Sequence, residues 1–128
     1  MHQSIINFTN IQNSIKENQE KTNNKNNIKI IAVSKTFEIS HINPLIDYGH
    51  TDFGENKVQE AIEKWSDIKH KNQKLSLHLV GKLQSNKTKL ALKIFDYIHS
   101  LDSEKLANKI SEEQKTIDKK PKLFIQVN

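Results

Sequence analysis

A lysine stands directly after an apolar run near the start of the chain. Residues 28–33 are largely apolar and β-branched, and they are followed by Ser34, Lys35 and Thr36. A lysine at the end of a buried strand lies near low-dielectric surroundings, which favour the neutral amine. A neutral amine attacks aldehydes, and the Schiff base that forms can hold a carbonyl substrate or an aldehyde cofactor. The structural alternative is that Lys35 extends into solvent or pairs with Glu55 at the end of the next strand.

Other polar residues follow the later apolar runs. Asn56 can donate and accept hydrogen bonds to a planar ligand, or it can simply cap the helix that follows. His78 lies inside an apolar run, where a histidine is either a base or a hydrogen-bonded core or lumen residue. The segment GKLQSNK, which contains Ser85 and Asn86, is similar to a loop that binds an anion and opens a helix. It lacks the glycine spacing of a P-loop.

Helices and strands alternate along the chain. Apolar residues at helical spacing and helix caps predict helices over 3–20, 39–47, 58–68, 90–95 and after the N-cap Ser103. Apolar, β-branched runs predict strands over 28–33, 51–54, 75–80, 97–101 and 123–127. Pro44 is expected to distort or delay the start of the second helix, Gly49 to end it, and Trp65 to be core. The strands start about every two dozen residues, which is the spacing of βα units in a parallel sheet.

Two α/β architectures fit this alternation. A five-stranded doubly wound sheet is complete at 128 residues, whereas a (β/α)8 barrel needs about 250. The last residue, Asn128, follows an apolar strand without a closing helix or polar tail, which favours the interrupted barrel. In both architectures ligands bind at the carboxyl ends of the strands, where Lys35 and Asn56 stand.

Composition excludes several classes of site. The chain has no cysteine, so it has no disulfide and no thiolate chemistry, and its six histidines lack the spacing of a metal site. The net charge is +5, but every basic residue is a lysine and acids alternate with them, which argues against nucleic-acid binding. No apolar stretch reaches the roughly 20 residues that span a bilayer. We therefore predict a cytoplasmic protein without a membrane partner.

Three motifs occur in a fixed order: IAVSKT from Ile31, FGENKVQE from Phe53 and HLVGKLQSNK from His78, with LFIQVN closing the chain. Together they resemble the pyridoxal phosphate homeostasis protein family from about residue 28 onward. The chain departs from the family pattern at Leu77, where an aromatic residue is usual, at Lys82, where proline is usual, and at Lys57, where tyrosine is common.

The resemblance implies the N-terminal portion, about five βα units, of an alanine-racemase-like TIM (β/α)8 barrel. Residues 1–128 would form a single incomplete domain, with an N-terminal helix over 1–20 and barrel strands over 28–128. It also implies that pyridoxal 5′-phosphate (PLP) is held as an aldimine on Lys35, with Asn56, His78, Ser85 and Asn86 lining the cofactor pocket. The family regulates intracellular PLP without an established reaction. Its remaining half carries the phosphate-binding loops, so binding by this truncated chain is expected to be impaired.

Two other functions remain open from the sequence. Racemase or lyase chemistry would need a second acid or base, for which His78 and Tyr48 are the candidates. Alternatively, the chain is a remnant of a split barrel. Five strands of a barrel leave unpaired edges, which predicts self-association or assembly with a separately encoded C-terminal half.

Overall fold

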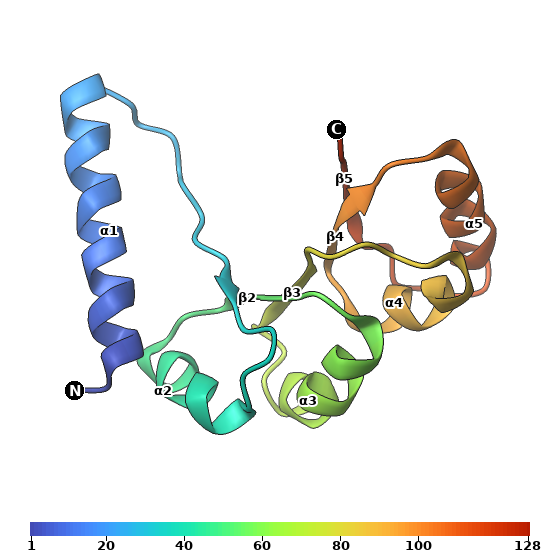
Figure 1. Cartoon of the computed structure of the whole chain (residues 1–128), viewed down its shortest axis with the longest axis horizontal. Helices are drawn as coiled ribbons and strands as arrows, with labels where there is room; N and C mark the ends of the chain where they lie inside the picture. The colour runs from blue at the N-terminus through green and yellow to red at the C-terminus, as the bar shows by residue number, and fades with distance from the viewer. The chain divides into compact units, whose positions relative to one another are not determined.

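Five parallel strands form one sheet in the computed structural model, which describes residues 1–128 (Figure 1). The strands are β1 (Ala32–Val33), β2 (Asp52–Glu55), β3 (Ser76–Leu79), β4 (Tyr97–Leu101) and β5 (Lys122–Ile125). Each strand pairs with the next one along the chain, in the order β1-β2-β3-β4-β5. A doubly wound sheet requires a reversal of strand order, so that alternative is wrong, and the order is that of consecutive strands in a (β/α)8 barrel.

The sheet belongs to a compact unit that contains residues 31–36 and 51–128. Its helices are α3 (Val58–Lys71), the short 3-10 helix η1 (Ser85–Lys87), α4 (Thr88–Ile94) and α5 (Glu104–Gln114). Consecutive right-handed crossovers place α3, α4 and α5 on the same side of the sheet (Figure 1). The core lies between these helices and the sheet. It is built from fully buried side chains that include Phe53, Trp65, Leu77, Leu79, Leu92, Phe95 and Ile98.

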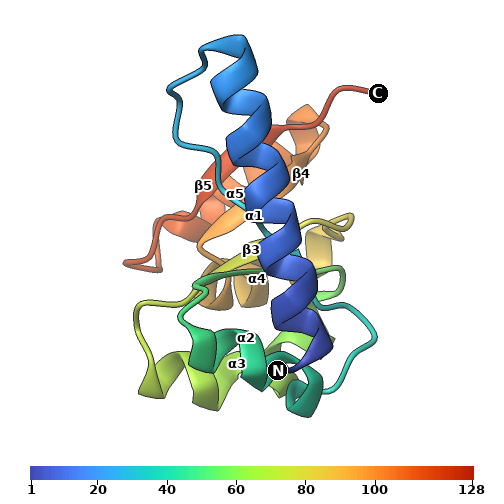
Figure 2. The ribbon, with the colours of Figure 1, turned by 90° about the vertical axis from the view of Figure 1, so that its left-hand side faces the viewer.

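The second compact unit contains residues 1–30 and 37–50. It consists of the long helix α1 (Gln3–Thr22), drawn in blue in Figure 2, and α2 (Ile39–Tyr48). Phe8 of α1 is buried and packs edge-on against Tyr48, with 6.2 Å between the ring centroids. Neither these helices nor any other in the chain is sufficiently long and apolar to span a membrane.

Local patterns predicted most elements well. The strand over 97–101 and the N-cap at Ser103 are confirmed, since Ser103 Oγ accepts a hydrogen bond from Leu106 N at 3.2 Å. Gly49 ends α2 with a φ of 109°, as expected of a glycine after a helix. The expected delay of the helix start at Pro44 is wrong, because α2 begins at Ile39 and Pro44 lies inside it. The missing N–H of Pro44 costs the helix one backbone hydrogen bond.

The first strand is much shorter than the predicted span of 28–33. Ala32 pairs with Phe53, so Ile31 lies opposite Asp52, where β2 begins. Residues 28–30 therefore precede the first position at which β2 offers a partner. The last strand is also shifted, to residues 122–125 from the predicted 123–127. Strand length here depends on the neighbouring strand, which a local pattern does not contain.

Candidate functional site

Lys35 lies in a turn immediately after β1, at the carboxyl edge of the sheet. Its side chain is exposed, and it makes neither a hydrogen bond nor an ion pair within the chain. Thr36 has a positive φ of 67°, which is unusual for a β-branched residue and has to be maintained by surrounding contacts. The unpaired amino group of Lys35 thus lies on a turn whose conformation depends on contacts with the rest of the structure.

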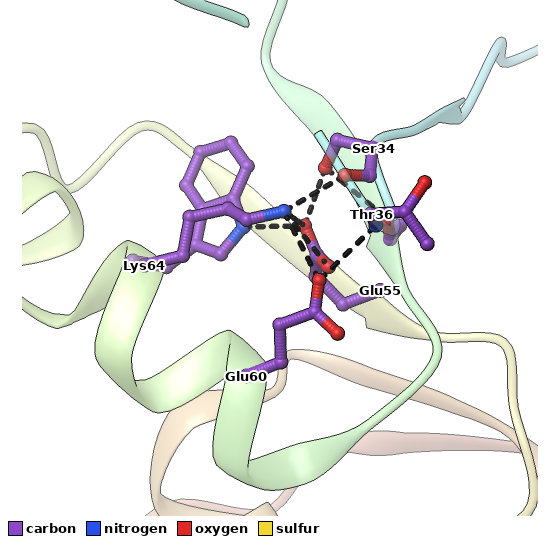
Figure 3. Close-up of polar contacts among 7 residues, drawn as sticks. Ser34, Thr36, Glu55, Glu60 and Lys64 are labelled. Atoms are coloured by element: carbon purple, nitrogen blue, oxygen red, sulfur yellow. Dashed lines mark hydrogen bonds and ion pairs between the residues drawn. The ribbon is translucent and has the colours of Figure 1, made fainter. Parts of the chain in front are cut away.

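One side of this turn is held by a buried carboxylate, Glu55, at the end of β2 (Figure 3). Glu55 Oε2 accepts hydrogen bonds from Ser34 Oγ and, at 2.8 Å, from Trp65 Nε1. Lys64 Nζ lies 3.0 Å from the same oxygen and donates to the Ser34 carbonyl oxygen at 2.8 Å. These contacts tie the residue before Lys35 to α3.

The other side of the turn is held by Glu60 of α3. Glu60 Oε1 accepts a hydrogen bond from the Thr36 backbone N–H at 3.1 Å, and it lies 3.6 Å from Lys64 Nζ (Figure 3). The residues on both sides of Lys35 are therefore anchored to one helix. Because the Glu55 side chain points toward α3, the predicted alternative pairing of Lys35 with Glu55 is wrong, and Lys64 takes that place.

The sequence did not reveal that Glu55, Glu60 and Lys64 act together. One signal was present, because Glu60 and Lys64 are four residues apart on a predicted helix. Nothing local indicated that this helical pair would reach the loop after a different strand. That contact follows from the parallel pairing of β1 with β2.

His78 is buried in β3 and fully engaged in polar contacts. Its Nε2 is 2.8 Å from Asp52 Oδ2, its Nδ1 is 2.9 Å from His99 Nε2, and its ring stacks on Tyr97 at 4.2 Å between centroids. Burial, together with the charge of His78, lowers the pKa of His99. The strand register places His78 level with Val33, two residues before Lys35. His78 is thus a hydrogen-bonded residue on the face of the sheet opposite Trp65.

Asn56 follows β2 at the same edge of the sheet and is half-buried. It is not a helix cap, because the N-cap of α3 is Lys57, which makes no side-chain capping hydrogen bond. Asn56 instead packs against Gly81 in the loop after β3. A Cβ atom at Gly81 would lie 2.2 Å from the Asn56 carbonyl oxygen and 2.8 Å from its Oδ1.

Ser85 and Asn86 lie in η1, at the start of the segment that leads into α4. Ser85 is half-buried and Asn86 is exposed. Both residues thus belong to a short helical turn that follows the loop after β3. The structure brings Asn56 together with the loop that precedes η1, and it places Lys35 and Asn56 after neighbouring parallel strands.

We expect Gly81→Ala to destabilise the chain by about 1 to 3 kcal/mol, because the new methyl group meets a backbone oxygen that cannot rotate away. Gly54→Ala is the matched control. Its Cβ would meet only side-chain atoms, with Ile31 Cγ2 nearest at 3.1 Å, and these can adjust. Urea unfolding of both variants measures the difference. Equal stability of the two would contradict the tight contact between Asn56 and Gly81.

Comparison with known proteins places these motifs in a family. The chain is 40% identical over 110 residues to the pyridoxal phosphate homeostasis protein of Haemophilus influenzae, a match that covers 86% of this chain and 46% of the relative. It is 39% identical over 119 residues to that of Pasteurella multocida, covering 93% of this chain and 50% of the relative. The chain belongs to the pyridoxal phosphate homeostasis protein family. It spans about half the length of the curated relatives it matches. No protein-family model matches it.

Solved structures of similar proteins agree with this family. PipY from Synechococcus elongatus, solved with and without PLP, is 38% identical, with a TM-score of 0.75 over 88% of this chain and 53% of that chain. A Bifidobacterium adolescentis protein of unknown function reaches a TM-score of 0.80 at 27% identity, over 90% of this chain and 51% of that one. The predicted fold class is confirmed: the family fold is present here over about half of its length.

Proposed function

We propose that the chain binds PLP covalently through Lys35 Nζ and serves intracellular PLP homeostasis, without catalysing a turnover reaction. One observation carries the proposal: Lys35 is an unpaired amine on a turn whose two flanking residues are both anchored to α3. The PLP-bound structure of PipY supports the choice of cofactor. PLP supplies an aldehyde, which condenses with a primary amine and releases water.

The anchoring distinguishes Lys35 from the other lysines of the chain. Lys64 and Lys69 are engaged in ion pairs with carboxylates, with Glu55 and Asp96 respectively. Other exposed lysines, such as Lys16, Lys71 and Lys105, lie on helices and not in the turn after β1. A rigid turn lowers the entropy lost when a ligand is fixed on its side chain, and this favours Lys35 as the attachment point.

The remaining pocket residues belong to the same proposal. Asn56, Ser85 and Asn86 follow β2 and β3 and are available for polar contacts with a ligand at the carboxyl edge of the sheet. His78 would support the pocket from within β3, where its ring nitrogens contact Asp52 and His99. We propose no role in proton transfer for His78, because both ring nitrogens already have partners. The cytoplasmic location and the single incomplete barrel domain also stay predictions.

Lys35→Ala tests the proposed function. Incubation of the unaltered chain with PLP is expected to give near-visible absorbance and, after borohydride reduction, a stable adduct located on Lys35 by peptide mass spectrometry. Lys35→Ala should lose both signals. Lys105→Ala, which removes another exposed lysine, serves as the control and should keep them. An adduct of equal yield in Lys35→Ala would contradict the proposal, because other surface lysines would then account for binding.

We also propose that the open sheet is completed by association, either with a second copy or with a separately encoded C-terminal half. β1 and β5 are the two edges of the sheet, and each has one unpaired side. Their apolar side chains Val33, Leu123, Phe124 and Ile125 are exposed. An apolar strand with free backbone groups readily pairs with another chain.

We expect light scattering to show oligomers or aggregates of the isolated chain, and we expect co-expression with the C-terminal half of a family member to suppress them. The reason is that pairing would satisfy the edge backbone groups and cover the apolar side chains of β5. A monodisperse monomer with a cooperative thermal transition would contradict this prediction.

A further inference from the structure

A cavity of about 470 Å³ lies between the loops that follow β2 and β3. It is lined by Asn56, Lys57, Val58, Gln59, Lys82, Gln84 and Lys87. Lys35 is not among these residues, although the cavity shares Asn56 with the proposed PLP pocket. Three of its seven lining residues are lysines, and none is acidic.

The three lysines have no partner that neutralises them. Lys57, Lys82 and Lys87 make no ion pair or side-chain hydrogen bond within the chain, whereas Lys64, Lys69, Lys109 and Lys119 each pair with a carboxylate. Like charges gathered around one cavity repel each other unless an anion lies between them. The cavity therefore has an uncompensated positive charge of three.

A close contact between two loops places Lys57 and Lys82 at the same cavity. Gly81 packs so closely on Asn56 that no side chain fits between them, and this contact holds the two loops together. Lys57 and Lys82 are the next residues along each loop, so they line the same cavity.

The start of α3 adds backbone donors to the same cavity. Val58 and Gln59, the first two residues of this 14-residue helix, both line it. The N-cap Lys57 offers no side-chain acceptor, so the N–H groups of the first turn are left for another acceptor. The positive end of the helix dipole and these N–H groups favour an anion at this position.

We propose that this cavity is a binding site for a small phosphorylated molecule with two to three negative charges. A phosphate dianion or a diphosphate matches the positive charge of three and offers acceptors to both the lysines and the amide groups of Asn56 and Gln84. Lysine binds phosphate as a point charge and does not require the planar geometry of arginine. The site acts independently of Lys35 and does not rest on the proposed function.

Titration calorimetry of the 128-residue chain with inorganic pyrophosphate at low salt tests the proposal. We expect saturable binding that weakens about tenfold on Lys57→Gln or Lys82→Gln and about a hundredfold in the double variant, as is typical for loss of a charge-assisted contact. Lys87→Gln should weaken it similarly. The matched control is Lys89→Gln with Lys105→Gln, two exposed lysines outside the cavity whose replacement changes the net charge equally.

The outcomes separate this site from both general charge attraction and PLP binding. Loss of affinity confined to the cavity variants, with urea midpoints unchanged, supports the site. An equal loss in the Lys89 and Lys105 control, or no binding by the unaltered chain, overturns it. Lys35→Ala should bind pyrophosphate normally, so failure of the covalent proposal leaves this result unaffected. Loss of pyrophosphate binding in Lys35→Ala would overturn the independence of the two sites.

Discussion

Replacing Lys64 by methionine is expected to destabilise the chain by about 3 to 5 kcal/mol, because it leaves a buried carboxylate without its cation. The Glu55 side chain is 0% exposed, and Lys64 is 9% exposed beside it. The remaining partners of Glu55, Ser34 Oγ and Trp65 Nε1, donate hydrogen bonds but carry no charge. Urea unfolding at neutral pH measures the effect.

Two controls isolate the buried charge. Adding Glu55→Gln to Lys64→Met removes the unpaired carboxylate and should restore part of the lost stability. Lys109→Met breaks the pair with Glu113, which is more exposed than the Lys64–Glu55 pair and whose atoms are 3.1 Å apart, and should change stability by less than about 1 kcal/mol. If Lys64→Met costs no more than Lys109→Met, Glu55 does not need its cation and the anchoring of the Lys35 turn is misassigned.

The same substitution links the anchor to the proposed function. Lys64→Met also removes the donor to the Ser34 carbonyl oxygen, which holds the turn before Lys35. We therefore expect a lower yield of the borohydride-fixed PLP adduct on Lys35 under conditions where the variant is still folded.

The second large effect concerns affinity for PLP. We expect the 128-residue chain to bind PLP at least about a hundredfold more weakly than PipY does, because the family resemblance assigns the phosphate-binding loops to the half this chain does not span. Each charge-assisted hydrogen bond to a phosphate contributes about 1.5 to 3 kcal/mol, so the loss of two already gives this factor. Equilibrium dialysis of both proteins under identical conditions measures it.

Equal affinities would contradict this prediction and would place the phosphate contacts within residues 1–128. The cavity lined by Lys57, Lys82 and Lys87 would then be the candidate for them. Lys57→Gln with Lys82→Gln distinguishes the two cases. The double variant should leave the yield of the Lys35 adduct unchanged if the phosphate of PLP does not use this cavity.

Local sequence was sufficient for the type and order of the elements. The strand at residues 97–101 and the helix after Ser103 were predicted correctly, because alternation, helical spacing and capping are properties of a few neighbouring residues. The position of Lys35 after an apolar run, and the ordered motifs around it, likewise identified the candidate site and the family without tertiary information.

The pairings between elements required the tertiary structure. The length of β1 depends on where β2 begins, and the choice between the two α/β architectures depended on strand order, which adjacent residues do not encode. The partner of Glu55 depends on which face of β2 it occupies and on the path of α3, and for that reason Lys64 rather than Lys35 neutralises it. The contact of Gly81 with Asn56, which gathers Lys57 and Lys82 at one cavity, joins loops about 25 residues apart. Long-range contacts of this kind arise from packing and burial, so only the folded chain decides them.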